Sequence, residues 1–263
     1  MALTPPNSTL VCPHCFGKIE LTAATTYKFP CNLSIICMTK GDDSRAGLLL
    51  WMAETAEGLG AEMVLGVEGE GKAPDFFGLP VKVFPIQTKG YVEGALNQLA
   101  SHAHGKWVLR LDDDESISPA MFDWLQKRKY LDCPAWAFPT AALWGDEEHF
   151  ITTPPLWPDT HVRLTSWHMS MDWPDEPHGK PKWVSQAKVA PVAIRHHKYL
   201  VKSRDERLEI AKGYETKLRG GGLGRRLAFN LPEEALGELR VSSVGDGPLS
   251  NVQPNSGEVI KTK

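Results

Sequence analysis

Short apolar runs alternate along the chain with segments whose apolar residues recur at helical spacing. Four runs have the length and composition of buried strands: 33–38, 62–67, 81–86 and 107–111. Residues 44–59 repeat apolar positions every three or four residues, with Ser44 placed to cap the helix and Gly60 to end it, and 91–102 shows a similar pattern. Strands that alternate with helices predict an α/β domain with a largely parallel sheet and helices on both faces.

The fourth predicted strand ends in four acidic residues, Asp112-Asp113-Asp114-Glu115. On an extended segment Asp112 and Asp114 share one face and Asp113 points to the other. Sheets of this class bind ligands at the carboxyl ends of their strands. Mg²⁺ and Mn²⁺ take carboxylate oxygens there and leave their other positions to water and substrate phosphates. The pattern predicts a divalent metal that holds a diphosphate, and the alternative is a solvated acidic turn.

Composition favours a folded protein and gives no global attraction to nucleic acid. The chain has 263 residues, of which 42% are hydrophobic, and a net charge of −3. One segment, 195–226, is locally basic, with ten Lys or Arg against four Asp or Glu. It could meet a donor diphosphate, a phosphorylated lipid or a nucleic acid backbone, or form a solvated helix face. Neither a signal peptide nor an apolar stretch near the roughly 20 residues of a transmembrane segment is present, so we expect a cytoplasmic protein.

The five cysteines do not suggest a secreted disulfide framework, because their number is odd. Cys12-Pro-His-Cys15 resembles one half of a zinc ribbon, and Cys31 follows at a suitable spacing, but Ser34 stands where a fourth ligand would be. The alternatives are a Zn²⁺ site at Cys12, Cys15 and Cys31, completed by another residue, and a degenerate ribbon or simple turn that carries thiols.

Over residues 32–215 the chain resembles the glycosyltransferases of family 2. The likeness rests on the opening strand and its polar loop, the helical segment 90–97, the acidic segment 111–118 in the place of the family's Asp-x-Asp motif, and the later segments 158–164, 173–178 and 194–199. The resemblance implies the GT-A fold, a Rossmann-like mixed and mostly parallel sheet flanked by helices. We expect an N-terminal Cys-containing extension (1–31), the GT-A domain (32–226) and a C-terminal segment (227–263), which should be largely flexible because it is rich in Ser, Gly, Pro and Asn from Val241 onward.

The resemblance also implies roles for individual residues. A divalent cation, Mn²⁺ or Mg²⁺, would be held by Asp112, Asp114 and one of His196 and His197, and imidazole suits Mn²⁺ better. The general base would be Glu176 or its neighbour Asp175, with Asp172 as a further candidate. Glu68 stands where many relatives place an aspartate that touches the nucleobase. Donor binding would involve Thr39, Glu68, Asn97, Asp112 and Asp113.

The expected function is therefore that of a metal-dependent glycosyltransferase that uses a nucleotide-diphosphate sugar. We expect the transfer to invert the configuration at the anomeric carbon. The acceptor would be a surface glycan or a lipid-linked sugar. A hydroxylated base in DNA is an alternative acceptor, as in phage-type modifying enzymes. Two further alternatives are a metal-dependent phosphohydrolase that uses the same acidic residues and a degenerate GT-A domain that only binds its ligand.

Overall fold

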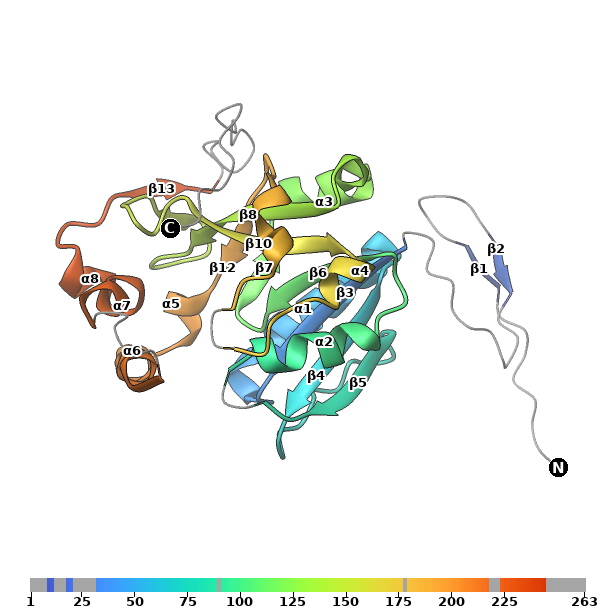
Figure 1. Ribbon diagram of the computed structural model, residues 1–263, viewed down its shortest axis with the longest axis horizontal. Helices are drawn as coiled ribbons and strands as arrows, with labels where there is room; N and C mark the ends of the chain where they lie inside the picture. Colours follow the sequence, from blue (N-terminus) through green and yellow to red (C-terminus); the bar gives the residue numbers. More distant parts are fainter. Residues whose placement is uncertain are drawn as a thin grey trace.

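The computed structural model of the chain describes residues 9–11, 18–20, 32–88, 91–176, 179–217 and 223–244. Within these ranges the centre of the protein is a nine-stranded sheet (Figure 1). Its strand order is β5 (Val81–Ile86), β4 (Glu62–Glu68), β3 (Leu33–Thr39), β6 (Trp107–Asp112), β10 (Asp159–Ser166), β8 (Ala135–Ala142), β12 (Ile194–His196) and β7 (Glu115–Ile117), and β11 (Lys188–Val189) also pairs with β8.

The sheet is mixed and mostly parallel. Strand β3 runs parallel to β4 and β6, and β4 runs parallel to β5. Strands β11 and β12 are parallel to β8. Strand β10 lies antiparallel between β6 and β8, and β7 is antiparallel to β12. The predicted fold class, an α/β protein with a mostly parallel sheet, is confirmed.

Helices cover both faces of the sheet, as the alternation along β3 requires. Ile35 packs with α1 (Ala46–Leu59) and α3 (Pro119–Gln126) on one face, through Met52 and Trp124 among others. Ile36 faces the other side and packs with α2 (Glu93–Ser101), while Trp167 of α4 (Trp167–Ser170) joins the same cluster. Neighbouring strand residues point to opposite faces, so one strand supplies both apolar layers.

The start of α1 differs from the prediction. A short 3-10 helix, η1 (Asp43–Arg45), precedes α1, and the Asp42 side chain accepts a hydrogen bond from the backbone nitrogen of Ser44 at 2.9 Å. Asp42 is therefore the capping residue and the expectation of a Ser44 cap is wrong, because the extra turn moves the cap two residues upstream. Gly60 ends α1 in the left-handed conformation, with φ of 62°, as predicted.

The C-terminal part of the described chain packs against the main body. After α5 (Lys198–Val201) come α6 (Arg204–Lys217), α7 (Leu223–Asn230) and α8 (Pro232–Ala235), and β13 (Val241–Ser243) pairs with β9 (His149–Ile151). Arg207 donates to the carbonyl oxygen of Asn230 at 2.6 Å and to Glu233 at 2.9 Å. The boundary expected after residue 226 falls inside α7, and these bonds connect α6 to the end of α7 and to α8.

Two further short elements, η2 (Lys129–Asp132) and η3 (Lys182–Gln186), connect the strands. In the N-terminal extension, β1 (Thr9–Val11) pairs antiparallel with β2 (Lys18–Glu20). Cys12, Cys15 and Cys31 lie outside the described residues, so zinc binding there stays a prediction. No helix in the described ranges has the length and apolar character that a membrane crossing requires.

Candidate functional site

Three predicted donor-binding residues lie at the carboxyl edge of the parallel strands. Thr39 ends β3, Glu68 ends β4 and Asp112 ends β6. The strand register places them at one edge, because Met38 pairs with Asp112 and Thr39 with Val67. The Thr88 hydroxyl donates to the Glu68 carboxylate. This edge is where α/β sheets bind ligands.

The acidic segment is a turn and not an extended strand. Strand β6 ends at Asp112, Asp113 and Asp114 form the turn, and β7 begins at Glu115. The alternation expected for an extended segment therefore stops at Asp112, and each of the three aspartates has different partners. The expectation that Asp112 and Asp114 share a strand face is corrected by this turn.

Asp112 lies between two arginines. Its Oδ1 accepts from Arg110 at 3.2 Å and its Oδ2 from Arg163 at 2.7 Å. Arg163 also donates to Glu115 at 2.5 Å, and Glu115 accepts from the backbone nitrogen of Asp112 at 3.0 Å. Burial would raise the pKa of Asp112, but Arg163 and Arg110 outweigh it and hold the pKa well below its usual range. The Asp112 carboxylate is ionised and fixed in place.

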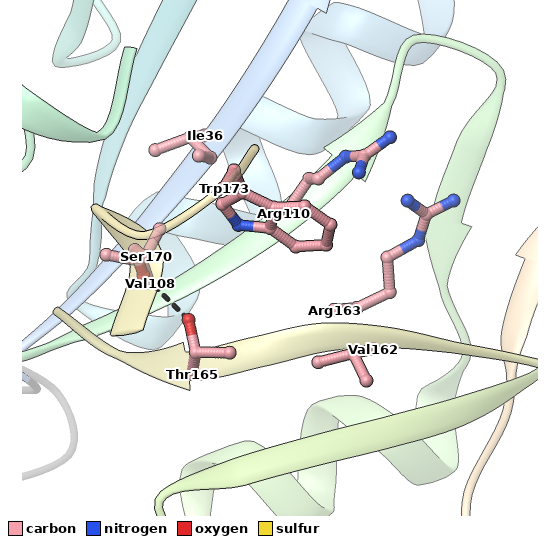
Figure 2. Close-up of a pocket in the computed structure, with 8 residues that line it drawn as sticks. All are labelled: Ile36, Val108, Arg110, Val162, Arg163, Thr165, Ser170 and Trp173. Atoms are coloured by element: carbon pink, nitrogen blue, oxygen red, sulfur yellow. Dashed lines mark hydrogen bonds between the residues drawn. The ribbon is translucent and has the colours of Figure 1, made fainter. Parts of the chain in front are cut away.

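Figure 2 shows the pocket beside these arginines. The two guanidinium groups point in one direction, and the Trp173 ring lies against Arg110, with its centroid 5.5 Å from the guanidinium carbon. At the opposite side, Thr165 and Ser170 share a hydrogen bond of 2.7 Å. Sequence reasoning missed Arg110 and Arg163. Arg110 could have been found, because it stands two residues before Asp112 on the same strand face.

Asp113 lies beside the end of β3, where the loop that follows this strand begins. Its Oδ2 accepts a hydrogen bond from the Thr39 hydroxyl at 2.9 Å. Burial and the neighbouring charge of Asp114 raise the pKa of Asp113 to about 6. The structure thus brings together two residues, Thr39 and Asp113, that the sequence assigned to donor binding.

Asp114 is the most buried of the three aspartates, with 5% exposure. Its Oδ1 lies 3.3 Å from Nε2 of His196, and its Oδ2 accepts from the Lys202 ammonium group. Burial alone would raise the pKa of Asp114, but His196 and Lys202 hold it well below the usual range. His196 and Lys202 thus keep a buried carboxylate ionised, whereas the carboxylates of a solvated acidic turn would be exposed to water.

His196 and His197 have different surroundings. His196 faces Asp114, whereas the His197 side chain is buried and its Nε2 lies 2.7 Å from the Ser116 hydroxyl. Burial lowers the pKa of His197 to about 4, so its ring is neutral near pH 7. The backbone nitrogen of His197 donates to the carbonyl oxygen of Asp114 at 2.8 Å, which holds the end of β12 against the acidic turn. Of the two histidines, His196 is the one beside a candidate metal ligand.

The donor set fits a sparse divalent metal site. A carboxylate from Asp114 and an imidazole from His196 suit Mn²⁺, which can take its other ligands from water and phosphates. Within the described ranges, no three His, Cys, Asp or Glu side chains gather closely enough to enclose a metal ion. Both oxygens of Asp112 are occupied by arginines. The arrangement is consistent with a metal that shares its coordination with a diphosphate.

The loop with the predicted general bases is attached to α2. Asn97 bonds the backbone of Trp173, and the Tyr91 hydroxyl donates to Oδ1 of Asp175 at 2.9 Å. Asp175 and Glu176 are both exposed. Both polar atoms of the Asn97 amide therefore bond the loop. The contact of Asn97 with the sugar donor stays a prediction.

No protein-family model and no curated protein matches the sequence. Similar solved structures include the mannosyltransferase PcManGT from Pyrobaculum calidifontis in complex with GDP-Man and Mn²⁺, with a TM-score of 0.46 and 13% identity over 78% of this chain and 69% of that one. TarS 1–349 from S. aureus has a TM-score of 0.43 and 15% identity, over 76% and 70%. HddC from Yersinia pseudotuberculosis has a TM-score of 0.39 and 11% identity, over 62% and 93%. Likenesses this distant carry no argument about activity, which is therefore argued from the site.

Proposed function

We propose that the protein is a metal-dependent glycosyltransferase, which moves a sugar from a nucleotide-diphosphate sugar to an acceptor hydroxyl. The observation that carries the proposal is the buried, ionised Asp114 beside His196, at the carboxyl edge of a mostly parallel sheet. The sequence resemblance to family 2 glycosyltransferases points to the same reaction. Both arguments lead to one region of the chain.

In this proposal Asp114 and His196 hold Mn²⁺ or Mg²⁺, and the bound ion neutralises charge on the leaving diphosphate. Lys202, which bonds Asp114, supplies a positive charge to the same region. The hydrogen-bonded pair of Thr39 and Asp113 would bind a group of the sugar donor at the carboxyl edge of the sheet. We also assign Glu68 and Asp112 to donor binding, and their places at the ends of β4 and β6 support this assignment.

The base would come from the loop that α2 holds. Glu176, or its neighbour Asp175, would accept the proton of the acceptor hydroxyl as that oxygen attacks the anomeric carbon. Both carboxylates are exposed and so can reach an acceptor. Attack from the face opposite the leaving group would invert the anomeric configuration.

The acceptor would be a surface glycan or a lipid-linked sugar, with a hydroxylated DNA base as the alternative. A phosphohydrolase that uses two metals needs more ligands than Asp114 and His196 provide, and the described residues form no larger ligand cluster. We therefore favour sugar transfer over phosphate hydrolysis.

Calorimetry with a panel of nucleoside diphosphates and their sugar conjugates, with and without Mn²⁺, tests the proposal. We expect one nucleotide to bind in a Mn²⁺-dependent manner, and Asp114→Asn to weaken this binding at least about tenfold through the loss of a ligand charge. Asp132→Asn is the matched control, because Asp132 is an exposed aspartate at a weak 3.9 Å ion pair with Lys188.

Both variants must unfold with the same midpoint as the parent, or within a few degrees, for the comparison to count. Absence of any Mn²⁺-dependent nucleotide binding to the folded parent protein would contradict the proposal. Turnover of the nucleotide sugar by Glu176→Gln and Asp175→Asn would then assign the base, because only the true base loses its pH-dependent rate.

A further inference from the structure

One arginine side chain joins the two ends of the acidic turn. Arg163 projects from β10 and is only 7% exposed (Figure 2). Its Nη2 donates to Oδ2 of Asp112, the last residue of β6, at 2.7 Å, and to Oε1 of Glu115, the first residue of β7, at 2.5 Å. One guanidinium nitrogen therefore connects the strands on either side of the turn.

A second contact of Glu115 closes the turn from within. Its Oε2 accepts a hydrogen bond from the backbone nitrogen of Asp112 at 3.0 Å. Glu115 is 1% exposed, so its charge is balanced by Arg163 and not by water. Between these two fixed residues the chain has only Asp113 and Asp114, so the anchors restrict the directions that those carboxylates can take.

The same glutamate lies in register with His196. Strand β7 pairs antiparallel with β12, and Glu115 is the partner of His196 in this pairing. The backbone nitrogen of His197 also donates to the carbonyl oxygen of Asp114 at 2.8 Å. Anchoring Glu115 therefore fixes both halves of the candidate metal site, the Asp114 carboxylate and the His196 ring, which lie 3.3 Å apart.

A second buried arginine offers a comparison outside the acidic turn. Arg207 is 6% exposed and also joins two acceptors, the carbonyl oxygen of Asn230 at 2.6 Å and the Glu233 carboxylate at 2.9 Å. Its partners belong to α7 and α8. Arg207 thus resembles Arg163 in burial and bonding, but it connects helices and not the ends of the turn.

We propose that Arg163 and Glu115 are positioning residues, which hold the acidic turn so that Asp114 and His196 face one common ligand. The proposal rests on the proposed function for the identity of that ligand, a divalent cation. Neither Arg163 nor Glu115 contacts the cation in this role. Altering side chains that hold metal ligands in place commonly changes metal affinity by about 10- to 100-fold.

Arg163→Lys and Glu115→Gln test the proposal, and Arg207→Lys is the matched control. Lysine keeps the positive charge, but its rotating ammonium group does not reproduce the fixed N–H directions of the guanidinium. Glutamine keeps the volume, but it has one oxygen where the Glu115 carboxylate uses two. Electron paramagnetic resonance of free Mn²⁺ measures metal affinity, and hydrogen exchange of the His197 amide in metal-free protein reports on the turn.

We expect each of the two variants to weaken Mn²⁺ binding about tenfold or more. Exchange of the His197 amide should become at least about tenfold faster, while exchange in the centre of β3 stays unchanged. Arg207→Lys should leave both quantities within about twofold of the parent, even if it lowers the melting temperature equally. A role in general stability alone would not produce this difference.

Parental Mn²⁺ affinity and parental exchange in both folded variants would overturn the proposal. An equal loss in Arg207→Lys would also overturn it, because the effect would then be one of general stability. Should a single variant fail to fold, Arg163→Gln combined with Glu115→Gln takes its place, since this pair removes both buried charges together.

The exchange measurement needs no metal, so it separates this proposal from the proposed function. A parent protein that binds no Mn²⁺ would contradict the proposed function. Faster exchange at His197 in Arg163→Lys would then still support the positioning role, and unchanged exchange would overturn it.

Discussion

The side-chain amide of Asn97 bonds both backbone groups of Trp173. Its Nδ2 donates to the Trp173 carbonyl oxygen at 2.8 Å, and its Oδ1 accepts from the Trp173 nitrogen at 3.0 Å. A residue in the middle of α2 thus fixes a loop that lies 76 positions later in the chain. The two bonds hold the backbone two residues before Asp175, and so they position the part of the loop that carries Asp175 and Glu176.

Asn97→Ala removes both bonds and frees the loop. We expect sugar transfer to slow about tenfold, because a base that is no longer held in place spends less time in reach of its proton. Binding of the nucleotide with Mn²⁺ should stay within about twofold of the parent. Steady-state kinetics and calorimetry measure the two effects separately.

Gln98→Ala is the control, since Gln98 is the exposed neighbour of Asn97 on α2. Unchanged turnover in Asn97→Ala would contradict the positioning role. A parallel loss of nucleotide affinity would instead support the contact between Asn97 and the donor that the sequence resemblance implies.

Gly94 and Gly47 are the second residues of α2 and α1, and they differ in their surroundings. A Cβ atom at Gly94 would come 2.7 Å from Oδ1 of Asp175 and 3.2 Å from the Tyr91 ring, whereas one at Gly47 would meet nothing within 4 Å. We expect Gly47→Ala to raise the free energy of unfolding by about 0.5 kcal/mol, because alanine loses less entropy in a helix. Gly94→Ala should lower it by about 1 kcal/mol, as Asp175 must leave its bond with Tyr91. Urea denaturation measures both, and equal shifts would contradict the predicted packing of the loop on α2.

Lys202 and the proposed metal compete for the charge of Asp114. Lys202→Met leaves this buried carboxylate with His196 alone, so we expect the metal-free protein to lose roughly 2–3 kcal/mol of stability. Mn²⁺ should raise the melting temperature of Lys202→Met more than that of the parent, because a ligand that binds only the folded state stabilises it and here no longer has to displace an ammonium group. Thermal unfolding with EDTA or Mn²⁺ measures the difference.

Lys188→Met is the matched control, because Lys188 is exposed and its contact with Asp132 is 3.9 Å long. It should leave both melting temperatures unchanged, since isolated surface ion pairs contribute little. If Mn²⁺ raised the melting temperatures of the parent and of Lys202→Met equally, the predicted competition between Lys202 and the metal for Asp114 would be contradicted.

Two buried groups should tilt the pH dependence of stability in opposite directions. The pKa of His197 in the folded protein is about 4, below its ordinary value of 6.5, so the unfolded chain binds more protons between these pH values and stability falls as the pH falls. The pKa of Asp113 is about 6, above its ordinary value of 3.8, so the folded state binds more protons there and stability rises as the pH falls.

Each effect amounts to about 3 kcal/mol at most, and in the parent protein they largely cancel between pH 6 and 4. His197→Gln should leave the Asp113 effect and make the protein relatively more stable at pH 4. Asp113→Asn should do the reverse. Urea denaturation in EDTA at several pH values gives the slopes, and parallel slopes in the two variants would refute the assignment.

The order of strands and helices from residue 33 to residue 112 could be predicted, because it follows from local patterns. Apolar runs predicted β3, β4, β5 and β6, and apolar residues at helical spacing before Gly60 predicted α1. Buried strands and amphipathic helices each require a characteristic spacing of apolar residues, which can be read from the sequence. The acidic end of β6 was also visible, because the strand pattern stops there at charged residues. The strand pattern could also have placed Arg110 on the same face as Asp112, a relationship that the sequence analysis missed.

The partners of the acidic residues were decided by the tertiary structure. A turn after Asp112 sends Asp113 to Thr39 and Asp114 to His196, and no local pattern distinguishes this turn from a continued strand. Arg163 reaches Asp112 only because β10 pairs antiparallel with β6. Arg207 of α6 likewise meets Asn230 at the end of α7 only because the two helices pack together. Local periodicity determines which elements form, whereas contacts between residues far apart in the sequence depend on how those elements pack, because the energy of such contacts is realised only in the assembled fold.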